Sequence, residues 1–265
     1  HTLAEVKQHA GGTEEPVERL KTEADLIMGA TSVVVFTNEE AGDLAQAFPS
    51  SLGRIFVAPA GVDFGQFKDV DIASARATLG FSSEAKLLLY VGRLDVFKGP
   101  DILLESLSVL RKTMEVELIL VGGYGSADPD VTRLINLADR LEINHAIYWR
   151  DAVPQDSLGN YYNAADLLVM PSYHESFGLV ALEAMACGTP VVASPVGSLK
   201  SLILDGVTGK LIPGHDPESL SDGIGEILGD AGLIQMFQRN AKEWAEKFPW
   251  SRAVDDVINI YRMSG

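Results

Sequence analysis

The chain has 265 residues, of which 46% are hydrophobic and 22% are charged, and its formal net charge at pH 7 is −16. This composition is that of a globular protein with one or two domains. The acidic charge argues against nucleic acid and anionic lipid surfaces as partners, because phosphate-rich surfaces select basic proteins.

The single cysteine, Cys187, excludes a disulfide framework and a cysteine-based zinc site. It fits a reducing compartment, and we expect a cytoplasmic protein. No apolar run reaches the ~18 residues that a membrane-spanning helix needs. The chain begins at His1 without an initiator methionine, which leads us to expect a fragment or a processed product.

Short apolar runs bounded by Gly, Pro or Ser predict buried strands of a parallel sheet. They lie at residues 32–37, 54–61, 87–92, 117–123, 146–149, 167–172 and 190–194. Helices are predicted between them, near residues 38–48, 100–112, 129–141, 156–165 and 177–187. This alternation predicts right-handed β-α-β crossovers and a doubly wound α/β fold. From about residue 216 onward the pattern predicts only helices, and "FPW" at 248–250 separates the last two.

Residues 61–73 read as a linker between two units. We therefore expect a first unit at 1–62 and a complete second unit at 63–265. The first unit offers only two strands, which is too few for a stable sheet of its own.

The stretch "HESFGLVALEAMACGTPVV" combines a predicted helix with two carboxylates, Glu175 and Glu183. Ser176 suits the N-cap of a helix at 177–187, and Gly188 suits its carboxyl-terminal cap. The free N–H groups near this amino end form a potential anion site, at Phe177, Gly178, Leu179 and Val180.

Glu183 lies five residues beyond Gly178, which spans about 7.5 Å along a helix. That is about the distance from a diphosphate to the diol of its ribose, to which a carboxylate can bond. The alternative is an ordinary buried helix whose glutamate reaches solvent. The two spaced carboxylates favour the functional interpretation.

"YVGRLDVFKGPD" places two cations, Arg93 and Lys98, directly after Gly92 at the end of a predicted strand. In so acidic a chain, they are natural partners for phosphate. The alternative is a solvated turn in which Asp95 and Asp101 neutralise them.

Together, "GRLDVFKG" and "PSYHESFGLVALEAMACGTPVVAS" resemble the two signatures of retaining GT-B glycosyltransferases of the group 1 type. "HTLAEVK" and "APAGVDFGQF" extend the resemblance over essentially the whole chain, closest to the branch of sucrose-phosphate synthase and inositol-phosphate N-acetylglucosaminyltransferase. The family implies two Rossmann-like domains: here a complete carboxyl-terminal, doubly wound sheet and the remnant of an amino-terminal domain. Most of the acceptor site would therefore be absent.

The resemblance also implies roles for individual residues. Arg93 and Lys98 would bind the diphosphate, Glu175 the transferred sugar and Glu183 the ribose. Main-chain groups from Ser176 to Val180, together with Gly92, would complete the donor site. His1 would approach the sugar and Thr2 the acceptor. Uracil would lie near Val153 and Leu158, although "WRDAVPQ" lacks the glycine common in relatives.

Several other motifs do not predict a site. "DVD" at 69–71 mimics a metal-binding motif, but it lies in the predicted linker, where Asp71 suits a helix cap. "GGYGSAD" at 122–128 resembles a dinucleotide loop without its third glycine, so a plain turn is expected. The remaining histidines show no metal spacing, His174 is expected to be exposed, and Cys187 is expected to be a core residue.

The predicted function is transfer of a sugar from a nucleotide sugar, with UDP favoured, to a hydroxyl acceptor such as a sugar phosphate. The resemblance implies retention of configuration, and helix dipole, Arg93 and Lys98 would suffice without a metal or other cofactor. Alternatives left open are a non-catalytic nucleotide-binding module, and a sugar-nucleotide epimerase or a phosphorylase of similar architecture.

Overall fold

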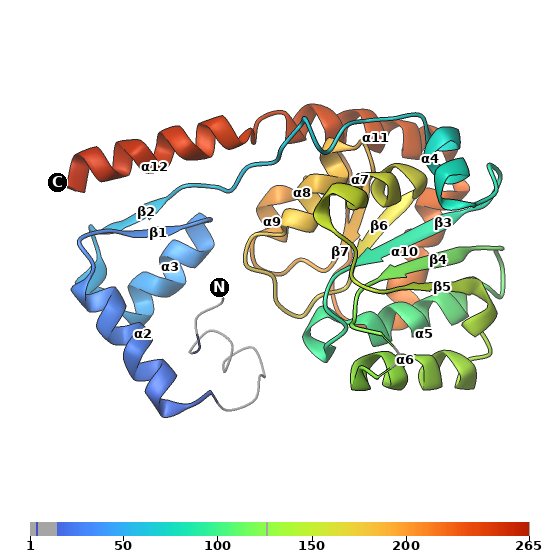
Figure 1. Cartoon of the computed structure of the whole chain (residues 1–265), viewed down its shortest axis with the longest axis horizontal. Helices are drawn as coiled ribbons and strands as arrows, with labels where there is room; N and C mark the ends of the chain where they lie inside the picture. Colours follow the sequence, from blue (N-terminus) through green and yellow to red (C-terminus); the bar gives the residue numbers. More distant parts are fainter. Residues whose placement is uncertain (1–3, 5–14, 126, 265) are drawn as a thin grey trace.

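A computed structural model describes Ala4 and residues 15–125 and 127–264 of the chain. These residues form a small two-stranded sheet and a larger six-stranded sheet, both parallel (Figure 1). None of the helices in these described ranges is both long and apolar enough to cross a membrane.

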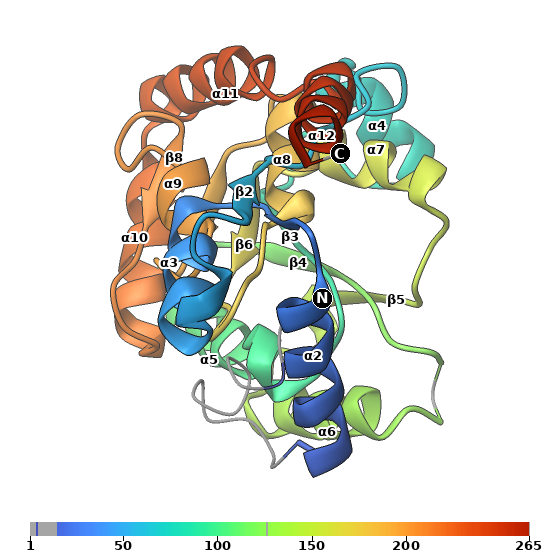
Figure 2. The same ribbon diagram turned by 90° about the vertical axis from the view of Figure 1, so that its left-hand side faces the viewer.

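The small sheet pairs β1 (Val33–Val35) with β2 (Ile55–Val57). Helix α2 (Val17–Gly29) precedes it, and α3 (Asn38–Ala47) connects its strands. A satellite core forms where Ile27, Val35 and Leu44 pack together. The two strands expected in the first unit are therefore present, and this part of the molecule faces the viewer in Figure 2.

The large sheet has the strand order β5-β4-β3-β6-β7-β8. Its strands are β3 (Leu87–Val91), β4 (Glu117–Val121), β5 (Ile147–Arg150), β6 (Leu167–Met170), β7 (Val191–Ala193) and β8 (Gly209–Leu211). The chain adds β4 and β5 on one side of β3 and then returns to add β6 on the other. This reversal between β3 and β6 is the topological switch point at which doubly wound sheets bind ligands.

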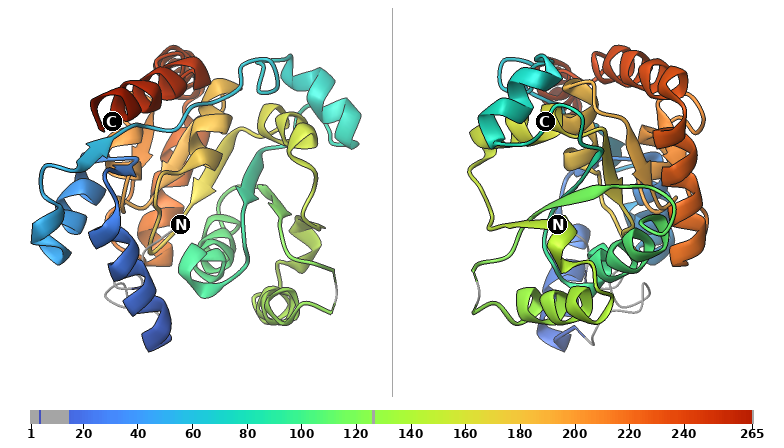
Figure 3. Two further views of the ribbon diagram at one scale, coloured as in Figure 1. Left: turned by 60° about the vertical axis from the view of Figure 1, so that its left-hand side comes forward. Right: turned by 90° about the vertical axis from the view of Figure 1, so that its right-hand side faces the viewer.

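Helices cover both faces of the large sheet (Figures 1 and 3). The core below one face contains Leu87 and Leu89 with side chains from α7 (Gln155–Ala164), α8 (Leu179–Ala186) and α11 (Ala231–Ala245). The other core contains Leu88 and Tyr90 with side chains from α5 (Pro100–Leu110), α6 (Pro129–Arg140) and α10 (Pro217–Gly229). Successive residues of β3 thus point to opposite faces, and both faces are dry, which explains its continuous apolar sequence.

Side-chain oxygens cap several helices by accepting from backbone N–H groups of the first turn. Thr37 caps α3, and Asp71 caps α4 (Ile72–Leu79) by accepting from the N–H of Ser74 at 2.9 Å. The prediction that Asp71 is a helix cap is therefore confirmed. Asp128, Asp216 and Asp230 cap α6, α10 and α11 in the same way.

The sequence pattern missed α2, β8 and the short α9 (Leu199–Leu202), and it anticipated α4 only through its cap at Asp71. Strand β8 has only three residues and no apolar run; it forms because the edge of β7 offers backbone partners to Gly209, Lys210 and Leu211. The helical tail is confirmed, since α10, α11 and α12 (Trp250–Ser264) follow in order with "FPW" at the last break. Helix α12 extends away from the large sheet toward the part that holds β1 and β2 (Figure 1).

The chain passes twice between the part that holds β1 and β2 and the part that holds the large sheet, once after β2 and once before α12 (Figure 1). The two passing segments lie side by side. The N–H of Val62 donates to the carbonyl of Phe248 at 2.9 Å, next to a bridge between Val62 and Pro249. A Cβ at Gly61 would lie 2.5 Å from the Trp250 backbone, so glycine permits this close crossing. The segment predicted as a linker is therefore fixed against the carboxyl-terminal helices.

Candidate functional site

The predicted site residues come from two neighbouring strands at the switch point. Gly92 and Arg93 directly follow β3, whereas the segment carrying His174 and Glu175 follows β6. Strands β3 and β6 are hydrogen-bonded neighbours in parallel, so both segments emerge at the same edge of the sheet. The fold therefore brings together two motifs that lie about 80 residues apart in the chain.

Helix α8 begins two residues later than predicted. It starts at Leu179, and its N-cap is Gly178, which has φ of 83° and makes no side-chain capping bond. The expectation that Ser176 caps this helix is wrong, because the cap position here is left-handed, a conformation that glycine adopts without strain. No side chain of the cap residue therefore accepts from the first backbone N–H groups of α8. Such unsatisfied N–H groups are what an anion site at a helix start requires.

Lys98 and Glu175 form an ion pair at this edge of the sheet. The Nζ of Lys98 lies 2.7 Å from Oε2 of Glu175, and both side chains are largely buried. Nζ also donates to the backbone carbonyl of His174 at 3.4 Å. Lys98 is positioned by a short helical turn, residues 96–98, which Asp95 caps. The sequence interpretation did not anticipate this pair.

Arg93 is held less firmly. Its guanidinium lies 3.1 Å from Asp95, and its side chain is 74% exposed. The alternative that Asp95 neutralises Arg93 is therefore correct for this conformation. The same alternative is wrong for Asp101, which pairs with Arg133 instead. The high exposure shows that little of the chain packs against the Arg93 side chain.

Most predicted donor-binding residues line one cavity at the amino end of α8. Gly92 and Lys98 close one side, and Phe36 from the end of β1 closes another, with its ring centroid 5.5 Å from that of Phe177. The remaining lining side chains and backbone groups come from β3, β6 and the start of α8: Tyr90, Val91, Met170, Ser172, Glu175, Ser176, Phe177, Gly178, Leu179 and Val180. We call this the first cavity.

A second cavity begins at Gly92 and Arg93 and continues along the carboxyl ends of β4 and β5. Val153 and Leu158, predicted to lie near uracil, both line it. Its other walls come from the loops after β3 and β4 and from nearby residues: Val91, Leu94, Asp95, Val121, Gly122, Gly123, Tyr124, Asp128, Asp130 and Ala152. The "GGYG" segment, interpreted as a plain turn, therefore faces this cavity. The sequence could have indicated this, because "GGYG" follows β4, the neighbour of the strand that Gly92 follows.

Glu183 is buried on α8, and its carboxylate accepts hydrogen bonds from two residues of α7. Its side chain is 7% exposed. The hydroxyl of Tyr162 donates to Oε2 at 2.7 Å, and the amide of Gln155 donates to Oε1 at 3.0 Å. Burial raises the pKa of Glu183 above its usual range, and the two hydrogen bonds oppose this rise. Glu183 lines neither cavity directly, so its predicted ribose contact stays a prediction.

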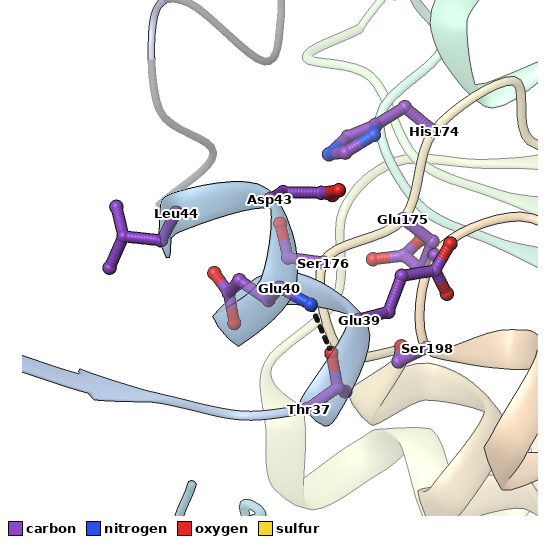
Figure 4. A pocket seen from close by; sticks show the side chains of 10 residues that line it. Thr37, Glu39, Glu40, Asp43, Leu44, His174, Glu175, Ser176 and Ser198 are labelled. Atoms are coloured by element: carbon purple, nitrogen blue, oxygen red, sulfur yellow. Dashed lines mark hydrogen bonds between the residues drawn. The ribbon is translucent and has the colours of Figure 1, made fainter. Parts of the chain in front are cut away.

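Glu175 also borders a third, acidic cavity that faces α3 (Figure 4). Glu39 and Asp43 reach from α3 toward the segment that carries His174 and Glu175. Glu39 pairs with Lys200 at 2.8 Å. His174 is half-buried, contrary to the expected exposure, and burial, followed by nearby Lys98, lowers its pKa. Glu175 thus lies between the first cavity and a region of negative charge.

Two predicted site residues remain untested, and one residue was predicted to belong to the core. His1 and Thr2 lie outside the described residues, so their roles stay predictions. Cys187 caps α8, is 3% exposed, and has a pKa raised to about 12 by burial, which fits a core thiol. In the described part of the chain, no group of three or more His, Cys, Asp or Glu side chains could hold a metal ion.

Comparison with known proteins places this arrangement in a family. The family model for "Glycosyl transferases group 1" matches residues 71–244. A D-inositol 3-phosphate glycosyltransferase from Xylanimonas cellulosilytica is 37% identical over 98% of this chain and 64% of its own length. The same enzyme from Acidothermus cellulolyticus is 39% identical over 99% of this chain and 60% of its own length. The chain thus spans less than two thirds of these relatives.

Solved structures agree. Sucrose-phosphate synthase from Thermosynechococcus elongatus matches with a TM-score of 0.90 at 31% identity, covering 99% of this chain and 66% of that one. HepE from Anabaena, in complex with UDP and glucose, matches with a TM-score of 0.83 at 24% identity, covering 92% and 67%, respectively. The fold matches GT-B glycosyltransferase structures, as expected. The chain belongs to the group 1 family of glycosyl transferases.

Proposed function

We propose that this chain is the donor-binding portion of a retaining glycosyltransferase that moves a sugar from a UDP-sugar to a hydroxyl acceptor. One observation carries the proposal: Lys98, Glu175 and the uncapped amino end of α8 meet in the first cavity, at the switch point of the sheet. Such a site combines a cation and backbone N–H donors for a diphosphate with a carboxylate for a sugar hydroxyl.

We assign the nucleoside of the donor to the second cavity. It shares Val91 and Gly92 with the first cavity, so a ligand can extend from one into the other. Val153 and Leu158 offer apolar surface to a flat base there. HepE, whose structure contains UDP and glucose, supports UDP as the nucleotide. The names of the inositol-phosphate relatives support a phosphorylated polyol as the acceptor class.

In the proposed reaction, the bond between the sugar's anomeric carbon and the diphosphate oxygen breaks, and its electron pair goes to that oxygen. The acceptor oxygen bonds to the anomeric carbon on the same face, and the departing phosphate takes the acceptor's proton. The protein stabilises the charge that develops on the diphosphate with the α8 N–H groups, Lys98 and Arg93. We propose that these groups suffice without a metal ion, and that the protein acts in the reducing cytoplasm.

A second candidate function is nucleotide binding without transfer by this chain itself. The chain spans 60–64% of two relatives, so a partner domain for the acceptor can lie outside it. Calorimetry of this chain with UDP, GDP and ADP tests the donor site, and saturable binding of UDP is expected. Product analysis on a full-length protein then tests transfer: a glycoside that keeps the donor's anomeric configuration is expected, whereas an inverted product contradicts the proposal. An epimerised nucleotide sugar without any glycoside would favour the epimerase interpretation.

A further inference from the structure

The carboxylate of Glu183 is held by one stripe of helix α7. Gln155, Leu158 and Tyr162 are spaced by three and four residues, so they lie on the same face of that helix. Gln155 and Tyr162 donate to the two oxygens of Glu183, while Leu158, between them in the sequence, lines the second cavity. The same face of α7 therefore carries both the two donors to Glu183 and Leu158, which lines the proposed nucleoside site.

Glu183 also lies on helix α8, the first residues of which line the first cavity. Leu179 and Val180, four and three residues before it on α8, line that cavity. Glu183 thus belongs to a bond network between two helices, each of which contributes to one of the two connected cavities. A ribose in a nucleoside diphosphate also lies between base and diphosphate.

The network fixes the carboxylate but does not neutralise it. In the ranges 15–125 and 127–264, Glu183 forms none of the ion pairs; its two partners are the neutral donors Tyr162 and Gln155. Burying a carboxylate with neutral partners alone is costly, and a well-packed apolar residue would usually be more stable there. A carboxylate accepts about four hydrogen bonds, so two donors leave capacity for a diol.

Tyr162 is itself rigid. It is fully buried, its ring packs edge-on against Phe67 with centroids 5.8 Å apart, and its carbonyl accepts from the hydroxyl of Thr189 at 2.7 Å. Burial and the adjacent Glu183 raise the pKa of Tyr162 well above its usual range, so its hydroxyl remains a donor at neutral pH. Its geometry leaves little freedom for the carboxylate that it holds.

We propose that Tyr162 is a positioning residue: its hydroxyl fixes Glu183 so that the carboxylate's remaining lone pairs accept from the ribose diol of the donor. The inference rests on the proposed function and deepens it, because it assigns discrimination between ribose and 2′-deoxyribose to Tyr162 acting through Glu183. Gln155 assists from the exposed end of α7. The alternative is that the pair of Tyr162 and Glu183 only stabilises the fold.

The test compares calorimetric Kd values of this chain for UDP and for 2′-deoxy-UDP. Tyr162→Phe removes only the hydroxyl. The matched control is Tyr148→Phe, which removes another tyrosine hydroxyl that donates to a glutamate, Glu117, at 3.0 Å near the amino ends of β4 and β5. The wild-type chain should prefer UDP by about tenfold or more, because bonds to a charged group are strong. Tyr162→Phe should reduce that ratio to about threefold or less, and Tyr148→Phe should leave it unchanged.

The outcomes separate the two proposals. A wild-type preference that Tyr162→Phe retains, or an equal loss of both ligands with a lower Tm, overturns the positioning role but not the donor site. A wild-type chain that binds no nucleoside diphosphate overturns the proposed function and this inference with it. Equal binding of both ligands by the wild type contradicts a diol contact at Glu183. If Tyr162→Phe fails to fold, Gln155→Ala at the exposed helix end provides the same readout, with a reduced ratio expected and an unchanged one overturning the proposal.

Discussion

The ammonium of Lys98 lies 2.7 Å from the carboxylate of Glu175, although 77 residues separate the two in the sequence. In the proposed reaction one binds the donor's diphosphate and the other its sugar. Without ligand, the Lys98 ammonium and the Glu175 carboxylate neutralise each other in a largely buried position. A diphosphate must compete with Glu175 for Lys98, and several predictions depend on this competition.

Replacing Lys98 with methionine should weaken UDP binding by about 1.5–3 kcal/mol, the usual range for a hydrogen bond to a charged group. Arg93→Ala should also weaken it, because Arg93 is exposed and able to turn from Asp95 to a phosphate. Calorimetry at constant salt gives both values. Lys242→Met is the matched control, since Lys242 pairs with Asp69 at 2.8 Å on the surface. Unchanged affinity in both site variants would refute the diphosphate assignment.

Glu175→Gln should strengthen the binding of UDP, whereas the Lys98 and Arg93 variants weaken it. The substitution removes a negative charge beside the phosphate site and releases Lys98, so UDP should bind more tightly by about 1 kcal/mol. The gain in affinity that the sugar contributes to a UDP-sugar should fall, because a neutral amide bonds more weakly to a hydroxyl. The affinity ratio of UDP-sugar to UDP measures this change. A ratio that stays at the wild-type value contradicts the sugar contact.

The buried Glu183 predicts a pH effect on stability. Its folded-state pKa is raised above the ordinary 4.5, so the folded chain binds more protons than the unfolded chain in the window just above that value. The Glu183 contribution to the free energy of unfolding should therefore fall as pH rises from about 4.5 through the raised pKa. Urea unfolding across pH 4–7 should show Glu183→Gln gaining stability relative to wild type with rising pH. Parallel profiles for the two proteins would contradict the assignment of the shift to Glu183.

Nucleotide binding should not depend on a divalent metal. The proposed positive charges are Lys98, Arg93 and the amino end of α8, all supplied by the chain. UDP affinity measured with and without EDTA should agree within about twofold, which is about 0.4 kcal/mol. Binding that is lost in EDTA and restored by magnesium or manganese would show that a metal bridges the diphosphate.

The chain by itself should bind UDP but transfer little sugar. The donor residues between Gly92 and Glu183 lie in the loops and helix at the edge of the large sheet, whereas the chain covers only 60–64% of two relatives. Positioning of an acceptor can supply about 7–11 kcal/mol of a barrier, so its absence should leave only slow hydrolysis. Labelled UDP-glucose and UDP-N-acetylglucosamine, offered with sugar-phosphate acceptors, provide the assay. Efficient transfer by this chain would show that its acceptor site is complete.

The sequence by itself determined strands β3 to β7 of the large sheet, because runs such as Leu87–Val91 are buried on both faces and must be apolar throughout. It also determined that Arg93, Lys98 and Glu175 follow strand ends, since the adjoining Gly and Pro residues end each run. Local chemistry was sufficient for the cap at Asp71 and the break at "FPW".

Only the tertiary structure decided which of these ends meet. The pairing of β3 with β6 brings Lys98 to Glu175, and nothing local to either segment encodes that contact. The start of α8 at Leu179 depends on the left-handed backbone of Gly178, whose added Cβ would lie 2.8 Å from Leu199 in another helix. The hydrogen bond from Tyr162 to Glu183 likewise exists because α7 packs on α8. That packing depends on the crossovers that set the order of the strands, and neither helix encodes it alone.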